Sequence, residues 1–129
     1  MNKQEEIKQE IIKLCGNTNK VSSFGWHFMR NNLHYFYVPD KEHKFIRITI
    51  PHIVKVDDAN KESVTDIINE TNREVKFVKA VILENGSISI SYDHKVAEQE
   101  NMAQIVSHII NTLDFASNYL MNKIKEKHC

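Results

Sequence analysis

The fold is decided by the stretch Trp26-His27-Phe28-Met29-Arg30-Asn31-Asn32-Leu33-His34-Tyr35-Phe36-Tyr37. Its aromatic residues recur at every second position on both sides of an Asn-Asn pair, which is the period of a half-buried strand. We therefore predict strands over residues 22–30 and 33–38, joined by a two-residue turn at Asn31-Asn32. This turn places Phe28 opposite Tyr35 and Trp26 opposite Tyr37.

A third strand is predicted over Lys44–Ile50, after a polar loop at Asp40–His43. A four-residue loop there pairs Tyr37 with Ile46 and Tyr35 with Ile48, and directly opposed residues share a face of the sheet. A one-residue shift in either pairing would move part of this set to the other face of the sheet. The agreement between the two turns therefore identifies the core face. The residues collected on that face are Phe24, Trp26, Phe28, Tyr35, Tyr37, Ile46 and Ile48.

The rest of the chain alternates between helical and strand periods. Apolar residues at helical spacing predict helices over residues 3–15, 60–74 and 98–125. Strands are predicted over 77–83 and 87–92, joined by Asn85-Gly86, so that Leu83 lies opposite Ile88. The order αβββαββα describes a single α+β domain over residues 1–129, with an antiparallel five-stranded sheet and three helices.

Composition narrows the classes of function. The 129 residues carry 17 Lys plus Arg and 17 Asp plus Glu. A net charge of zero exerts no long-range attraction on nucleic acid or on anionic lipid, so we expect neither as a partner. No apolar run approaches the roughly 18 residues of a membrane span. The N-terminal residues are charged rather than apolar, and we expect a cytoplasmic protein.

No pattern of catalytic or metal-binding residues is present. His27 and His34 are predicted to be diagonal neighbours on the second face of the first hairpin, but no Asp, Glu or Cys completes a close ligand spacing. Cys15 falls in the apolar stripe of its helix, which is typical of a small core residue. We therefore expect no enzyme, no metal site and no cofactor.

The second face of the sheet is the most suggestive feature. Its apolar side chains require either cover by the middle helix or contact with a partner, and the sequence leaves both possibilities open. The candidate partner-binding residues are Met29, His34, Phe36, Phe45 and, from the second hairpin, Ile82.

One segment resembles a known family. Residues 67–79 read Ile-Ile-Asn-Glu-Thr-Asn-Arg-Glu-Val-Lys-Phe-Val-Lys, a helix end followed by a basic and aromatic strand start. Together with the element order and the long last helix, this segment resembles the YbjN-like family, whose fold is similar to that of type III secretion chaperones. The resemblance implies a non-enzymatic, protein-binding role with homodimerisation. Secretion chaperones tend to be acidic, whereas this chain is neutral.

The leading hypothesis is therefore a protein-binding or chaperone-like module that forms a homodimer. Two alternatives stay open: a small-molecule-binding protein or enzyme with an unrecognised site, and a sheet that binds RNA through a small basic and aromatic patch.

Overall fold

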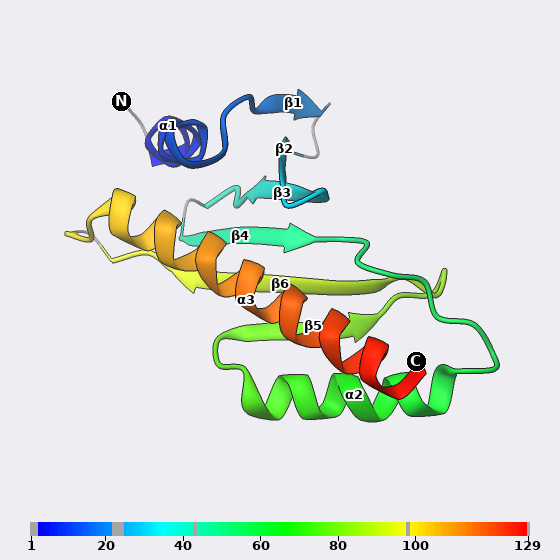
Figure 1. Ribbon diagram of the computed structural model, residues 1–129. Helices are drawn as coiled ribbons and strands as arrows, with labels where there is room; N and C mark the ends of the chain where they lie inside the picture. The colour runs from blue at the N-terminus through cyan, green and yellow to red at the C-terminus, as the bar shows by residue number, and fades with distance from the viewer. Residues whose placement is uncertain (1–2, 22–24, 43, 98, 129) are drawn as a thin grey trace.

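A computed structural model describes residues 3–21, 25–42, 44–97 and 99–128 (Figure 1). The helices are α1 (Lys3–Cys15), α2 (Lys61–Glu74) and α3 (Met102–His128). The strands are β1 (Asn19–Val21), β2 (Gly25–Arg30), β3 (Leu33–Pro39), β4 (Phe45–Ile50), β5 (Val78–Ile82) and β6 (Ile88–Lys95).

The strands form one antiparallel sheet in the order β1-β2-β3-β4-β6-β5. The α+β class is confirmed, but the sheet has six strands rather than the predicted five. The additional strand is β1, whose three residues are all exposed and show no alternation to reveal a strand. It forms because β2 offers an edge on which Lys20 pairs with Trp26. The predicted start of the first strand, including Phe24, lies outside the described residues.

The first hairpin has the predicted register. Asn31 and Asn32 both adopt left-handed backbone conformations, with φ of 54° and 65°, as a type I′ turn requires. Phe28 lies opposite Tyr35, and Trp26 lies opposite Tyr37. Buried residues on these strands therefore include Phe28, Tyr35 and Tyr37, as predicted for the core face.

The predicted register between β3 and β4 is wrong by two residues. Tyr37 lies opposite Ile48, and Pro39 lies opposite Ile46. The Asp40 carboxylate accepts hydrogen bonds from the backbone N–H groups of Lys44 (2.9 Å) and Phe45 (3.2 Å), which closes a longer loop than the four-residue one expected. Because a shift of two keeps every side chain on its face, Ile46 and Ile48 are still buried in the core.

The predicted register of the second hairpin is wrong by one residue. Gly86, with φ of 86°, donates its N–H to the Leu83 carbonyl at 2.9 Å, so the loop holds three residues rather than two. Ala80 consequently lies opposite Ile90, and Ile82 opposite Ile88. This slip exchanges the faces of β5, and the placement of Ile82 on the second face is therefore wrong: its side chain packs against the core.

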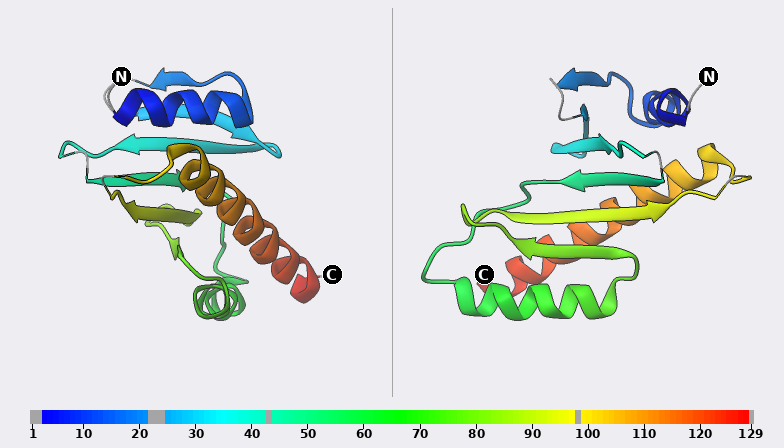
Figure 2. Two further views of the ribbon diagram at one scale, coloured as in Figure 1. Left: turned by 90° about the vertical axis from the view of Figure 1, so that its left-hand side faces the viewer. Right: turned by 180° about the vertical axis from the view of Figure 1, so that it is seen from behind.

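Helices α1 and α3 lie on the core face of the sheet. The buried side chains Ile7 and Ile11 anchor α1, which contacts α3 and β2, and Lys8 of α1 places its ammonium 4.2 Å from the centre of the Trp26 ring. Helix α3 crosses the sheet in front of β6 and β5 (Figures 1 and 2). The fully buried residues of α3 are Val106, Ile109, Ile110, Leu113, Ala116, Ser117 and Leu120.

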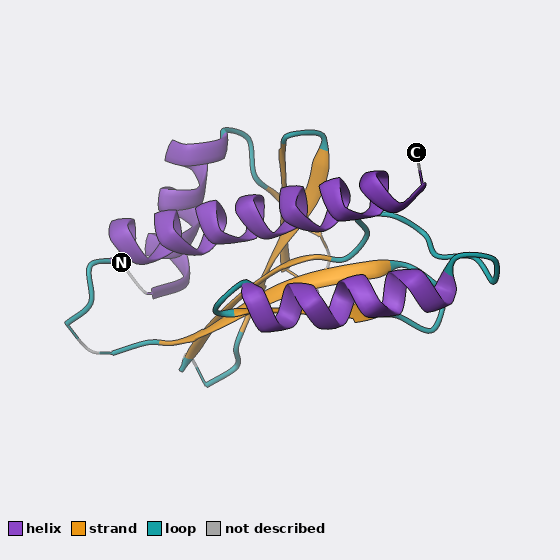
Figure 3. Cartoon of the chain, turned by 60° about the horizontal axis from the view of Figure 1, so that its bottom comes forward, coloured by secondary structure: helices purple, strands orange, loops and turns teal. Residues whose placement is uncertain are grey.

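Helix α2 lies beside α3 and along the edge strand β5, not over the second face of the sheet (Figure 3). The Asn72 side chain donates to the Ala80 carbonyl at 3.0 Å and accepts from the Ala80 N–H at 2.7 Å. Asn72 thus satisfies a backbone donor and acceptor of β5 as a further strand would. The interpretation in which the middle helix covers the second face is wrong.

Gly25 is predicted to be indispensable for the β2–β3 pairing. Its φ is 154°, and a Cβ atom there would collide with the backbone carbonyl oxygen of Tyr37. We expect Gly25→Ala to lower the free energy of unfolding by more than about 3 kcal/mol, measured by urea denaturation. The matched control is Gly86→Ala, whose Cβ would lie 3.1 Å from the Val56 carbonyl oxygen; we expect it to cost about 1–2 kcal/mol, the left-handed penalty for alanine. Equal losses would contradict the role of the collision.

Asn72 is predicted to stabilise the fold through the β5 edge. Asn72→Ala leaves the Ala80 N–H and carbonyl without this partner, so we expect a loss of about 1–3 kcal/mol in chemical denaturation. Asn69→Ala is the control, because Asn69 lies exposed on the same helix; its effect should stay within about 0.5 kcal/mol. A similar loss in both variants would contradict a specific role of the two bonds to Ala80, because Asn→Ala by itself favours a helix.

Candidate functional site on the open face of the sheet

The sheet has one face that no helix covers within the described chain, and we call it the open face. Seen from behind, the strands lie in front of α3 (Figure 2). The strand registers place on this face side chains that alternate with those of the core. They include His27 and Met29 of β2, His34, Phe36 and Val38 of β3, Phe45, Arg47 and Thr49 of β4, and Ser91 and Asp93 of β6.

The apolar part of the open face lies on β2, β3 and β4. Met29 is 44% exposed and Phe45 is 45% exposed, while Phe36 and Val38 are half-buried. Apolar side chains gathered on adjacent strands of an uncovered face are typical of an interaction surface. Together these four residues form a surface that we call the apolar patch.

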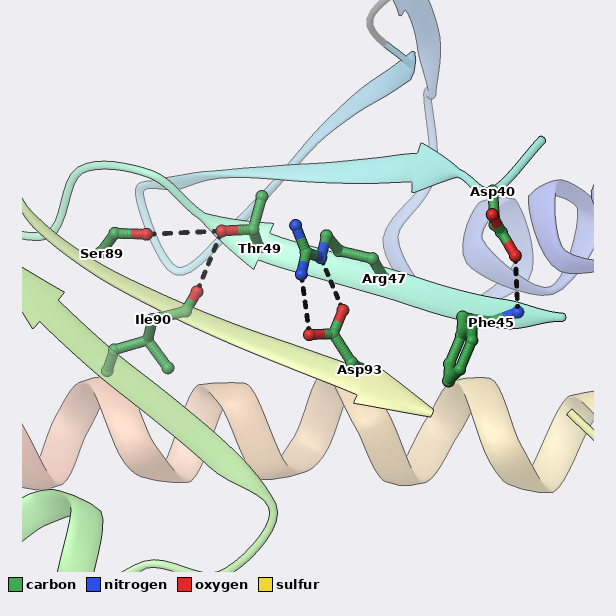
Figure 4. Close-up of polar contacts among 7 residues, drawn as sticks. All are labelled: Asp40, Phe45, Arg47, Thr49, Ser89, Ile90 and Asp93. Atoms are coloured by element: carbon green, nitrogen blue, oxygen red, sulfur yellow. Dashed lines mark hydrogen bonds and ion pairs between the residues drawn. The ribbon is translucent and has the colours of Figure 1, made fainter. Parts of the chain in front are cut away.

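An ion pair borders the apolar patch. Arg47 and Asp93 lie directly opposite each other on β4 and β6, with Arg47 Nε 2.6 Å from Asp93 Oδ1 and Nη2 2.9 Å from Oδ2 (Figure 4). The hydrogen bond and the charge of Asp93 raise the pKa of the Arg47 guanidinium. Because the pair is bidentate, the Arg47 charge is already matched by a carboxylate.

A hollow lies between the ion pair and the apolar patch. It has a volume of about 420 Å³ and is lined by Val38, Pro39, Asp40, Phe45, Arg47 and Asp93. Phe45 and the Arg47–Asp93 pair project from the same side of the sheet (Figure 4). The hollow therefore has an apolar wall beside a polar rim made by the Arg47–Asp93 pair and the Asp40 carboxylate.

The open face becomes polar toward β6 and β5. Thr49 donates its hydroxyl to the Ile90 carbonyl at 3.2 Å and lies 3.5 Å from the Ser89 hydroxyl (Figure 4). On β5, the observed register places Lys79 and Val81 on this face, opposite Ser91 and Ser89. Apart from Val81, these side chains are small or polar, so the apolar patch lies at the other end of the sheet.

The two predicted histidine neighbours are in direct contact. His27 Nε2 lies 2.7 Å from His34 Nδ1, and the ring centroids are 5.0 Å apart, so the two rings lie end to end with their nitrogens facing. The Phe36 ring lies against His27 at 5.1 Å. The predicted pairs that produce this contact, His34 with Met29 and His27 with Phe36, are confirmed.

Four of the five candidate residues lie on the open face, and one does not. Met29, His34, Phe36 and Phe45 occupy adjacent strands of the open face, whereas Ile82 faces the core. Sequence reasoning missed Val81, which is 37% exposed and takes the place assigned to Ile82. A three-residue loop ending in Gly86 is a known alternative to a two-residue Asn-Gly turn and would have given the correct face.

The surroundings of Cys15 disfavour a role as nucleophile. Burial raises the pKa of the Cys15 thiol, and the opposing hydrogen bond from Arg30 is the smaller effect. A raised pKa disfavours the thiolate, which is the nucleophilic form. No group of three or more His, Cys, Asp or Glu side chains within the described ranges is placed to hold a metal ion. None of the described helices combines the length and apolarity needed to cross a bilayer.

Comparison with known proteins shows similarity in structure only. No family model and no curated protein sequence matches the chain. The crystal structure of YbjN from E. coli, a proposed transcription regulator, superposes with a TM-score of 0.73 over 98% of this chain and 94% of YbjN, at 9% sequence identity. An uncharacterised protein from Methanothermobacter thermautotrophicus gives a TM-score of 0.61 over 96% of this chain and 97% of that protein, at 16% identity.

Proposed function

Because this chain has a YbjN-like fold in which one sheet face is left uncovered, we propose that it is a non-enzymatic protein-binding module and that the open face is its binding surface. The observation that carries the proposal is the apolar patch on β2, β3 and β4, with Met29 and Phe45 nearly half exposed. His34 extends the same surface.

The chemistry of the open face favours an apolar protein segment as its ligand. Burying Phe45 and Met29 against a partner removes apolar surface from water, worth about 25 cal/mol per Å². The Arg47–Asp93 pair lies at the border of the patch and carries no net charge, so it can remain hydrated at the rim of an interface. An extended or helical segment laid across the strands would cover both.

We propose a second copy of the chain as the first partner. In a two-fold symmetric dimer the same patch meets itself, so apolar residues on one copy meet apolar residues on the other. Because the formal net charge of the chain is zero, no long-range repulsion opposes the approach of two copies. The association should therefore change little between low and high salt, because it rests on apolar burial rather than on exposed charges.

Phe45→Asp is predicted to weaken self-association without unfolding the chain. Light scattering over a range of concentrations should show a concentration-dependent dimer for the unaltered chain. Phe45 is 45% exposed and both copies of a two-fold dimer carry it, so the substitution removes the burial of about one whole Phe side chain in total, worth about 1.5–3 kcal/mol, and should raise the dimer dissociation constant roughly 10- to 100-fold. Phe36→Asp should act in the same direction with the circular dichroism spectrum preserved. Loss of the fold in Phe36→Asp would instead place Phe36 in the core.

Phe115→Asp is the matched control for this prediction. Phe115 is 62% exposed but belongs to α3, on the other side of the sheet. Its substitution removes a similar apolar surface and should leave the dissociation constant unchanged. A strictly monomeric unaltered chain, or equal weakening by Phe115→Asp and Phe45→Asp, would refute self-association through the open face.

Two other observations bear on the alternative functions. An RNA-binding sheet would bind an oligonucleotide at low salt and lose affinity steeply as salt rises. An enzyme or small-molecule receptor requires a cavity that encloses most of its ligand. The hollow beside Phe45 is open to solvent along the sheet, and this geometry favours a protein surface over an enclosed ligand.

A further inference from the structure

The contact between His27 and His34 is an aligned hydrogen bond. His27 Nε2 lies 2.7 Å from His34 Nδ1, the ring centroids are 5.0 Å apart, and the ring planes are inclined by 29°. Because the rings lie end to end, the N–H group of one ring points at the lone pair of the facing nitrogen. The two nitrogens can lie this close only while one of them carries a proton and the other does not.

The backbone holds the two rings in this arrangement. His27 is paired with Phe36 and His34 with Met29, so the two histidines are diagonal neighbours on β2 and β3. The turn at Asn31-Asn32 sets this register within the hairpin itself. The Phe36 ring lies 5.1 Å from the His27 ring, which places the hydrogen-bonded pair directly beside the apolar patch. Any charge that the pair acquires is therefore a charge at the border of the proposed binding surface.

The open face supplies no counterion to the pair within the described chain. No described carboxylate forms an ion pair with either imidazole. On β4 and β6, Arg47 and Asp93 bind each other through two hydrogen bonds of 2.6 and 2.9 Å. On β1, the residue opposite His27 is the uncharged Asn19. A proton added to the pair is therefore not neutralised by contact with an acidic side chain.

The other charged groups around the hairpin lie on its core side. The ammonium groups of Lys8 on α1 and Lys20 on β1 lie 4.2 and 6.0 Å from the centre of the Trp26 ring, which packs against the core. Arg30 at the turn lies 3.7 Å from the Asp114 carboxylate of α3. These groups are positive or already paired, so none of them offsets a charge on the histidines.

We propose that the His27–His34 pair is a pH-sensitive element that opens when both imidazoles are protonated and then weakens association through the open face. The first proton taken up in acid goes to the second nitrogen of the donor ring, so the hydrogen bond survives with one positive charge. The second proton goes to the accepting nitrogen itself. Both facing nitrogens then carry N–H groups, and the rings must separate. Imidazoles change charge between about pH 8 and 5, which sets the range of the switch.

The effect on association rests on the proposed protein-binding role of the open face. Full protonation places a positive charge on each imidazole, and a two-fold dimer carries the pair on both copies. Like charges brought together at an interface repel, and burying them without partners costs free energy. Association should therefore be strong above about pH 7 and weak near pH 5. The acid form should also become sensitive to salt, because ions screen this repulsion.

Nuclear magnetic resonance of the chain labelled with ¹⁵N-histidine tests the opening directly. At about pH 8 we expect a scalar coupling between the two facing nitrogens, transmitted through the hydrogen bond, and at about pH 5 we expect its loss, with every ring nitrogen of the pair protonated. His34→Gln should lack the coupling at both pH values. His108→Gln should keep it at the higher pH, because His108 lies on α3 and contacts the Phe77 and Tyr92 rings.

Light scattering over a range of concentrations tests the effect on association. For the unaltered chain, the dimer dissociation constant should rise roughly tenfold or more between about pH 8 and pH 5. The double variant His27→Gln/His34→Gln keeps polar side chains that cannot be charged, so its dissociation constant should rise much less. His108→Gln is the matched control and should respond as the unaltered chain does. Circular dichroism at both pH values should show that every variant is folded.

The two measurements fail separately. Absence of the coupling at the higher pH, or its persistence in acid, would refute the pH-sensitive pair. An equal response to pH in the unaltered chain and in the double variant would refute its effect on association. A chain that is monomeric at the higher pH would refute self-association and the acid effect on it, whereas loss of the coupling in acid would still establish that the pair opens.

Discussion

The rest of the structure depends on the antiparallel pairing of β2 with β3 across the Asn31-Asn32 turn. Side chains alternate between the two faces of a strand, so this one register sends Phe28 and Tyr35 into the core and His34 to the other side. Side chains at the turn also form hydrogen bonds to α3: Asn31 donates to Asp114, and Arg30 donates to Asn111 at 3.1 Å. The hydrogen bonds between β2 and β3 therefore determine which side chains face the core and which lie on the open face.

The exposure of the open face follows from how the three helices are used. Helices α1 and α3 cover the core face, and α2 completes the β5 edge through Asn72 and packs beside α3. An unpaired sheet edge invites association with other chains, so the cover of β5 removes one route to aggregation. It leaves no helix in the described chain to cover Met29 and Phe45, and this exposure is the basis for proposing the open face as a binding surface.

The open face combines three kinds of chemistry on neighbouring strands. The apolar patch supplies exposed hydrophobic surface, the Arg47–Asp93 pair supplies a polar but neutral border, and His27 and His34 supply a hydrogen-bonded imidazole pair. Each depends on cross-strand pairs and not on neighbours in sequence, because the groups involved come from β2, β3, β4 and β6. A shift of register by one residue would dismantle all three.

The sequence by itself determined the α+β class, the first hairpin and the apolar residues of its core face, because turn type and alternation are local properties. It also brought His27 beside His34. The register of β5 with β6 was decided by tertiary structure: Asn85-Gly86 can close a two- or a three-residue loop, and burial of Val78 and Ala80 requires the longer one. The position of α2 was likewise beyond the sequence, since its apolar stripe fits either face of the sheet. Packing against α3 and β5, together with the bonds from Asn72 to Ala80, holds it at the edge.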